Sequence, residues 1–185
     1  IGSPLSDAVL GAGNRSDAYA VCEVSSFQAE LSDGLRLDGL IWINFAEDHL
    51  DRYATLADYF AAKQRLFSCL NPDAPCVLGA SVVAFNPAVA DIPHGALVLP
   101  AAEPFEGLEA RSPFYQYPQS ENFALGAALW RALDLPLQAL TRSANNFQLA
   151  AHRLSEMECW GGVSFWDDSK ATNFHAALAA MDALG

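Results

Sequence analysis

Two short apolar runs, residues 18–24 and 39–45, constrain the fold of this chain most strongly. Neither run alternates between apolar and polar residues, and such strands are typical of a parallel sheet that is covered on both faces. Segments with helical periodicity at residues 5–10, 56–70 and 121–133 separate and follow these runs. This alternation predicts an α/β fold with a mostly parallel sheet flanked by helices.

Smaller elements complete this pattern. Residues 76–78 and 96–99 are further apolar runs, which we expect to add strands to the sheet. Residues 138–149 predict one more short helix. The stretch 87–118 carries several prolines with little periodicity, so we expect it to be mostly irregular.

The pattern changes after residue 150. Two strand-like runs flank the Gly161-Gly162 pair and predict a hairpin, and a helix is expected from about Phe174. The expected hairpin strands are residues 154–159 and 163–166. We therefore place a domain boundary near residue 150, which divides the chain into residues 1–149 and 150–185.

The charge balance disfavours anionic partners. The 185 residues include 10 Lys and Arg against 22 Asp and Glu, a formal net charge of −12. Nucleic acid and anionic lipid headgroups would be repelled unless positive charge is concentrated locally, so we expect neither as a partner. No stretch approaches ~18 uninterrupted apolar residues, and the start has no basic region followed by an apolar core, so neither a membrane span nor a signal peptide is predicted.

The ends of the chain and its cysteines give two further expectations. The chain starts at Ile1 without an initiator Met and stops directly after an apolar helical run, so we interpret it as part of a longer protein. Its four cysteines form no CxxC pair, and three of them lie in apolar runs. This usage is typical of reduced thiols in a cytoplasmic protein and gives no support to a zinc site.

Polar residues follow the first two predicted strands. Glu23 ends the run 18–24, and ligands of parallel sheets bind at the carboxyl ends of the strands. A carboxylate there is costly unless it is paired or metal-bound, but an acid that caps the next turn explains Glu23 equally well. His49 lies in the polar stretch 44–53 after the second run; taken alone, a turn histidine is its more common role. Together, the two strand ends favour a site.

Lys63 occupies an unusual place in its predicted helix. At 100° per residue it falls in the middle of an apolar stripe that includes Phe60 and Phe67. A lysine in such a stripe usually extends its amine to solvent. It could instead supply charge to a site at the strand ends, or be carbamylated into a carboxylate-like oxygen ligand; the sequence leaves these alternatives open.

A second group of candidates lies beyond residue 150. Residues 168–173 stand between a predicted strand and a helix, where Ser169 or Thr172 would serve as the N-cap. Lys170 would then fall in the first helical turn, where a cation opposes the helix dipole, and a bound anion such as phosphate would resolve that conflict. Arg153 offers a planar donor for the same anion. A GxxxxGK[ST] phosphate loop is absent from the sequence, so a nucleotide would need a loop located upstream.

Several ordered blocks of this sequence resemble the Mur ligases of peptidoglycan synthesis, and among them the branch that adds D-glutamate. The blocks are Ile1-Gly-Ser-Pro-Leu5, Glu23-Val-Ser-Ser-Phe-Gln28, Asn44 with Glu47-Asp-His-Leu-Asp-Arg-Tyr53, Ala61-Ala-Lys63, His152-Arg-Leu154 and Asp168-Ser-Lys-Ala-Thr-Asn173. The last block discriminates, because the branches that add other amino acids differ there. The resemblance spans nearly the whole chain.

This resemblance implies both a fold and an activity. The fold is a central ATP-binding domain of P-loop type over residues 1–149, without its P-loop, followed by the first elements of a Rossmann-like C-terminal domain. The activity is ATP-dependent addition of D-glutamate to UDP-N-acetylmuramoyl-L-alanine through an acyl phosphate, with ATP and Mg²⁺ required. A cytoplasmic monomer is expected, and the chain alone is expected to be inactive.

The resemblance also implies a role for nine residues. Glu23 and His49 would ligate Mg²⁺ together with a carbamylated Lys63, and these three form the implied catalytic group. Asn122 would contact adenine, Asp168 the ribose, and Arg153 and Lys170 the phosphates. Ser25 would contact the UDP-sugar substrate and Thr172 the incoming D-glutamate. Because Arg153 and Lys170 lie beyond the domain boundary, closure of the two domains would be needed to bring them to ATP.

Three departures from the family pattern and two alternatives accompany this interpretation. Pro118-Gln119 stand before Asn122 where the family has His-Asn nearby, Asp167 replaces the usual Asn, and Ser155 stands where an acid is common. One alternative function is a related ligase for another amino acid, similar to folylpolyglutamate synthases. The other is a catalytically inactive binding or scaffold module; the presence of Lys63 and Glu23 argues against it, because buried charges are costly to keep.

Overall fold

The computed structural model describes residues 5–12, 15, 18–91, 96–98 and 105–184. Residues 1–4 of the first family block and Leu99 of the predicted strand 96–99 lie outside the described residues. Within the part of the chain that is described, no helix is long and apolar enough to cross a membrane.

A parallel sheet of three short strands forms the centre of the fold. Its strands are β1 (Leu40–Trp42), β2 (Cys76–Leu78) and β3 (Ala96–Val98), in the order β1-β2-β3. Trp42 pairs in register with Leu78, and Leu78 with Val98, so the three carboxyl ends lie at the same edge. The predicted parallel α/β architecture is confirmed, and β2 has the predicted bounds.

Helices connect and cover these strands. The predicted helical segments are confirmed, although residues 65–69 tighten into a 3₁₀ turn at the end of the segment 56–70. The helices are α1 (Leu5–Ala12), α2 (Ser26–Ala29), α3 (Leu56–Gln64), η1 (Arg65–Cys69), α4 (Ala80–Phe85), η2 (Pro87–Asp91), η3 (Pro113–Tyr115), α5 (Gln119–Ala132), α6 (Leu137–Asn145) and α7 (Phe174–Leu184). The stretch 87–118 holds only β3 and two 3₁₀ turns among its described residues, as its prolines predict.

The predicted strand at residues 18–24 is wrong. These residues carry no strand assignment, and Tyr19 and Val21 are 69% and 96% exposed. A strand needs a neighbour for its backbone hydrogen bonds, and in the described part of the chain no strand pairs with this segment. Apolar composition alone therefore does not make it a strand. Glu23 consequently lies in an exposed irregular segment and not at a buried strand end.

The central strand β2 is buried from both sides, which explains its unbroken apolar sequence. Cys76 and Leu78 pack into a cluster with α3, whereas Val77 packs against Leu125 and Ala128 of α5. Successive side chains of a strand point to opposite faces of the sheet, so each face of β2 meets a different helix. The sheet is thus held between α3 and α5.

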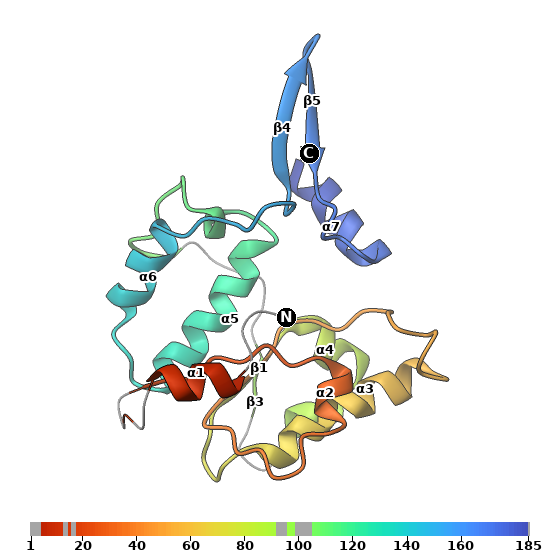
Figure 1. Cartoon of the computed structure of the whole chain (residues 1–185), viewed down its shortest axis with the longest axis vertical. Helices are drawn as coiled ribbons and strands as arrows, with labels where there is room; N and C mark the ends of the chain where they lie inside the picture. The colour runs from red at the N-terminus through yellow and green to blue at the C-terminus, as the bar shows by residue number, and fades with distance from the viewer. Residues whose placement is uncertain (1–4, 13–14, 16–17, 92–95, 99–104, 185) are drawn as a thin grey trace.

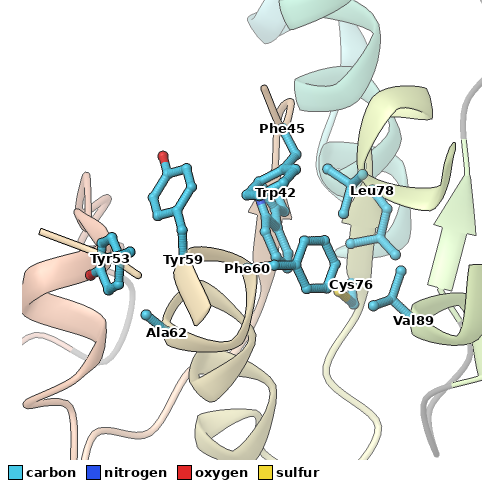
Figure 2. Packing of buried hydrophobic residues seen from close by; sticks show 10 residues of the cluster. Trp42, Phe45, Tyr53, Tyr59, Phe60, Ala62, Cys76, Leu78 and Val89 are labelled. Atoms are coloured by element: carbon cyan, nitrogen blue, oxygen red, sulfur yellow. The ribbon is translucent and has the colours of Figure 1, made fainter. Parts of the chain in front are cut away.

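Aromatic residues fill the α3 side of the core. Figure 2 shows Phe60 of α3 pointing towards Trp42 of β1, and their ring centroids are 4.6 Å apart. Phe45, which follows β1, meets the Phe60 ring edge-on at 4.9 Å. Both Phe60 and Phe45 are buried, and Tyr59 extends the cluster towards Tyr53 at 5.3 Å. This packing fixes α3 against the end of β1, where the polar stretch 44–53 begins.

The segment after residue 150 carries its own two-stranded sheet and a helix, and we refer to it as the unit after residue 150. Strands β4 (Ser155–Trp160) and β5 (Val163–Asp167) make the predicted antiparallel hairpin across Gly161-Gly162, both of which have positive φ. Figure 1 shows this hairpin projecting away from the other elements, with α7 near its base. Its large apolar side chains remain exposed, Trp160 for example at 76%, because a two-stranded hairpin has no second layer to cover it.

Gly79 gives a direct test of the β1–β2 arrangement. A Cβ at this position would lie 1.8 Å from the backbone oxygen of Ile43, so Gly79→Ala should lower the free energy of unfolding by about 3 kcal/mol in urea denaturation. Gly126 in α5 is the control, because nothing lies within 4 Å of its added Cβ. Gly126→Ala should raise that free energy by about 1 kcal/mol through helix propensity. Equal effects of the two substitutions would contradict this packing.

Candidate functional site

A cleft of about 720 Å³ opens at the carboxyl ends of the parallel strands. Ile43 and Asn44 after β1, and Gly79 and Ser81 after β2, form its floor. The Ser81 hydroxyl accepts a hydrogen bond from the Phe45 N–H at 3.0 Å and joins the two strand ends. Tyr59 and Lys63 of α3, the first turns of α5 and the unit after residue 150 supply the remaining walls. Ligands of open parallel sheets bind in this position.

The cleft gathers positive charge in an acidic chain. Lys63 and Lys170, the two lysines of the sequence, both line it, and so does Arg153. Lys63 comes from α3, whereas Lys170 and Arg153 come from the unit after residue 150. The structure thus places Lys63 in the same cleft as two cations that follow it in the sequence by 90 and 107 residues. The carboxylates of Asp48, Glu121 and Asp168 line the cleft as well, so acids and cations are equal in number there, whereas the whole chain has a formal net charge of −12. Relative to the rest of the chain the cleft is therefore the place that favours an anionic ligand.

Lys63 is half-buried. Its Nζ lies 5.2 Å from the centroid of the Tyr59 ring, over the face of the ring. Burial lowers the pKa of this amine from its ordinary value of 10.5, and the charge of nearby Asp48 opposes that shift. Burial, together with the charge of Asp48, also raises the pKa of Tyr59 to about 12. A lowered pKa leaves more neutral amine, which is the form of lysine that reacts as a nucleophile.

Asp48 is a site residue to which the sequence analysis assigned no role. It lines the cleft, and both of its carboxylate oxygens accept hydrogen bonds. Oδ1 accepts from the backbone N–H of His49 at 2.8 Å, and Oδ2 accepts from Nδ2 of Asn173 at 2.9 Å. Asp48 and Asn173 both lie inside the family blocks, so the sequence carried a signal that could have marked each of them as a candidate site residue. Only the fold shows that Asp48 and Asn173 meet.

His49 is held against aromatic rings. Its ring centroid lies 5.1 Å from that of Phe27 and 5.5 Å from that of Tyr59. Its φ of 56° is rare for a residue other than glycine, and two backbone N–H groups, those of Arg52 and Tyr53, donate to its carbonyl. This turn orients the imidazole between α2 and α3. His49 itself is not among the described residues that line the cleft.

Ser25 serves as the N-cap of α2. Its Oγ accepts from the Gln28 N–H at 3.2 Å, while Oε1 of Gln28 accepts from the Ser25 N–H at 2.9 Å. The sequence carries this capping-box signal as Ser-x-x-Gln, which our sequence analysis missed. Glu23, Ser25 and Thr172 are likewise absent from the described residues that line the cleft. The structure therefore collects only part of the expected site in one cavity.

The blocks 152–154 and 168–173 come together at the base of the hairpin. Oδ1 of Asp168 accepts from the Leu154 N–H at 3.0 Å, and the Lys170 N–H donates to the His152 carbonyl at 3.1 Å. These bonds hold His152 and Leu154 at φ values of 67° and 45° on either side of Arg153. A strained backbone of this kind persists only where surrounding contacts determine it. Arg153 is thereby directed to the cleft that Asp168 and Lys170 also line.

The expected N-cap of the last helix is wrong. The helix begins at Phe174, and Oδ1 of Asn173 accepts from the Ala176 N–H at 2.8 Å, so Asn173 caps it in place of Ser169 or Thr172. Lys170 consequently lies before the helix and not in its first turn. The inferred conflict between this lysine and the helix dipole does not exist, and the support for an anion comes from the convergent cations instead.

Asp167 carries its negative charge within a set of local hydrogen bonds. Its Oδ2 lies 2.6 Å from Nδ1 of His152, and its Oδ1 accepts from the Ser169 N–H at 2.9 Å. Hydrogen bonds from Ser169, then from His152, lower the pKa of this carboxyl to about 2. The side chain that departs from the family pattern is thus engaged in local hydrogen bonds.

Asn122 and its neighbours form the α5 wall. Nδ2 of Asn122 donates to Oε1 of Gln119 at 3.0 Å, and both side chains line the cleft with Tyr117. Burial, then the charges of Glu121 and Asp182, raises the pKa of Tyr117. Amide groups and an aromatic ring on one wall can hydrogen-bond and stack a planar heterocycle.

The described residues contain no group of three His, Cys, Asp or Glu side chains able to hold a metal. Glu23 and His49 would supply two donors of the expected metal set, and a third would have to come from elsewhere. A carbamate on Lys63 provides an oxygen donor of the kind that Mg²⁺ prefers. With such a carbamate the three residues offer donors that Mg²⁺ accepts, and of the three only Lys63 is among the described residues that line the cleft.

The family of this chain follows from sequence comparison. Residues 5–96 match the Mur ligase middle domain, and this match covers β1, β2 and their carboxyl ends at the cleft. The chain belongs to the Mur ligase family, as its sequence blocks predict.

Its curated relatives specify the branch. The chain is 33% identical to UDP-N-acetylmuramoylalanine--D-glutamate ligase of Nitrosospira multiformis, over 100% of this chain and 44% of that protein. It is 35% identical to the enzyme of that name from Pseudomonas aeruginosa, over 89% of this chain and 41% of that protein. The chain thus spans less than half the length of the curated relatives it matches.

A solved structure supports the fold. The chain superimposes on a crystal structure of MurF from Acinetobacter baumannii with a TM-score of 0.60 and 15% sequence identity, over 86% of this chain and 39% of that one. At that identity the match concerns the fold alone. Three strands and the helices around them therefore belong to a known α/β architecture.

The burial of Lys63 predicts a pH-dependent stability. Because its pKa is lowered in the folded protein, the unfolded chain binds this proton more tightly, and stability rises with pH up to about 10.5. Lys63→Met should raise the urea midpoint at pH 7, and its advantage over the parent chain should shrink as the pH approaches 10.5.

The control for this prediction is Lys170→Met, since the Lys170 side chain is exposed. It should change the free energy of unfolding by no more than about 0.5 kcal/mol at pH 7. A lower urea midpoint for Lys63→Met at pH 7 would contradict this prediction, because it would show that burial of the Lys63 amine does not reduce the free energy of unfolding.

Proposed function

We propose that the complete protein carrying this chain is an ATP-dependent ligase that joins D-glutamate to UDP-N-acetylmuramoyl-L-alanine in peptidoglycan precursor synthesis. The observation that carries the proposal is the convergence of Lys63, Arg153 and Lys170 on one cleft at the strand ends. The names of the curated relatives supply the substrates. Under this proposal the enzyme works in the cytoplasm as a monomer.

The chemistry proposed for the cleft explains why cations gather there. The terminal carboxylate of the substrate attacks the γ-phosphorus of ATP, the bond to the ADP oxygen breaks, and an acyl phosphate forms. The amine of D-glutamate then attacks the acyl carbon, phosphate leaves, and the amine loses a proton as the amide forms. The first step brings two anions together, so side-chain cations lower its barrier by offsetting the developing charge.

The ATP-binding roles fall on the walls of the cleft. Arg153 and Lys170 contact the phosphates, Asp168 the ribose and Asn122 the adenine. All four line the cleft. The hydrogen bonds from Leu154 to Asp168 and from Lys170 to His152 keep the wall formed by the unit after residue 150 in one geometry. A preorganised wall reduces the cost of ordering these side chains when the nucleotide binds.

The metal role falls on Glu23, His49 and Lys63. Mg²⁺ bound by these residues would supply positive charge near the γ-phosphate. The neutral amine that burial of Lys63 favours is the form that reacts with CO₂ to give the carbamate. The Tyr59 ring contacts the Lys63 amine, and the Phe27 ring packs against the His49 imidazole, so both side chains are held in place.

The remaining proposed contacts are to the two joined substrates. Ser25 contacts the UDP-sugar substrate, and Thr172 contacts D-glutamate. The Ser25 backbone N–H already donates to Gln28 within the cap of α2, so the remaining lone pair of Ser25 Oγ would contact the substrate. We retain the domain boundary near residue 150 as part of this proposal, with a central ATP-binding domain before it and the start of the C-terminal domain after it.

The test is phosphate release by the complete protein with ATP, Mg²⁺ and UDP-N-acetylmuramoyl-L-alanine. Release should depend on D-glutamate and should be absent with L-glutamate, L-lysine or no amino acid. Release with a different amino acid would assign another ligase activity, and no release from folded protein would favour an inactive binding module. The chain of 185 residues alone should release none, because it lacks a GxxxxGK[ST] loop.

Lys63→Ala tests the carbamate. The substitution should reduce D-glutamate-dependent ligation by at least about 1,000-fold, since it removes charge stabilisation at the transferred phosphoryl group. Short-chain carboxylates added to this variant should restore part of the rate by replacing the carbamate oxygens. Lys63→Arg keeps the positive charge but cannot form a carbamate, so it should be inactive as well. Full activity of either variant would remove Lys63 from the mechanism.

A further inference from the structure

Asp48 joins two segments that lie far apart in the sequence. Its Oδ2 accepts a hydrogen bond from Nδ2 of Asn173, 125 residues away. Its Oδ1 accepts from the His49 N–H, and Oδ1 of Asn173 accepts from the Ala176 N–H. A continuous line of hydrogen bonds therefore runs from the His49 turn through both side chains to the start of α7.

The position of Asn173 determines where its neighbours lie. Lys170 stands three residues before it, and Asp168 two residues before that, on a segment whose turn is closed by the Ala171 N–H donating to the Asp168 carbonyl at 2.8 Å. Asp48 lies across the cleft on the side of the sheet, close enough to Lys63 to affect its pKa. The Asp48–Asn173 bond thus spans the cleft between its two walls.

We propose that Asp48 is a positioning residue, which holds the segment 168–173 over the cleft through its hydrogen bond to Asn173. The bond pairs an ionised acceptor with an amide donor, and both side chains are partly buried. Hydrogen bonds to charged groups are stronger than neutral ones, so this bond favours the arrangement in which the cations of both walls face one cavity. The effect of this bond on catalysis rests on the proposed function, whereas the bond itself is observed.

Exchanging the two side chains provides the test. Asn173→Asp alone would place two carboxylates against each other, and Asp48→Asn alone would place two amides there. The double variant D48N/N173D restores the bond with donor and acceptor reversed. In that variant the new amide oxygen at position 48 still accepts from the His49 N–H, and the new carboxylate at position 173 still caps α7.

The complete protein should show this exchange in its kinetics. For Asn173→Asp, kcat/KM for ATP should fall at least about tenfold, and for the double variant it should return to within about threefold of the parent value. Gln138→Glu is the matched control, because this exposed residue of α6 gains the same charge and is not among the described residues that line the cleft, so kcat/KM should stay unchanged. A double variant no more active than Asn173→Asp would overturn the proposal.

Hydrogen exchange separates this inference from the proposed function. In the complete protein, the amides of Lys170 and Ala171, which lie in the held segment 168–173, should exchange at least about tenfold faster in Asn173→Asp and be protected again in the double variant. That result in a protein without ligase activity would refute the proposed function and keep the positioning role. Unchanged exchange in Asn173→Asp would overturn the positioning role, whatever the activity.

Discussion

The burial of β2 between two helices is the constraint on which the rest of the structure depends. Val77 faces α5, whereas Cys76 and Leu78 face α3, so both helices are fixed relative to one strand. This arrangement sets the edge where the strands end, and Gly79 lets the chain pass close to Ile43 at that edge. The cleft is therefore a consequence of how the core packs, and its floor is rigid backbone.

The same packing explains the electrostatics of the cleft. Phe60 and Tyr59 point into the aromatic core, and Lys63 follows them on the same helix, so its amine must leave the core at the strand ends. There it meets Asp48, whose carboxylate offsets part of the cost of burying the amine. Across the cleft, the hydrogen-bonded base of the hairpin presents Arg153 and Lys170. An acidic chain thus concentrates its lysines where an anion would bind.

The sequence predicts those features that depend on local pattern. The apolar run 76–78, the helical segments and the Gly161-Gly162 hairpin are confirmed because periodicity and turn chemistry determine them. Residues 18–24 have the same apolar composition as a strand, but no neighbouring strand pairs with them within the described chain. Strand formation depends on that partner, which composition does not reveal.

The candidate site likewise contains residues that the sequence identifies and contacts that only the fold shows. Lys63 could be identified from its position on a helical face, and Arg153 and Lys170 from chemistry and motif. The pairing of Asp48 with Asn173 joins residues 125 apart and could only come from the fold. The capping roles of Ser25 and Asn173 were missed for a different reason: Ser, Thr and Asn all serve as N-caps, so the correct residue depends on where the helix begins.

The transfer of ¹⁸O tests the central claim most directly. In the complete protein, with ATP and UDP-N-acetylmuramoyl-L-alanine labelled in its terminal carboxylate, the account predicts that each amide formed with D-glutamate releases phosphate carrying one labelled oxygen. That oxygen reaches phosphate only if the carboxylate attacks the γ-phosphorus and the acyl–oxygen bond later breaks. Unlabelled phosphate, released while the amide forms, would contradict the acyl phosphate and with it the role assigned to the cations of the cleft.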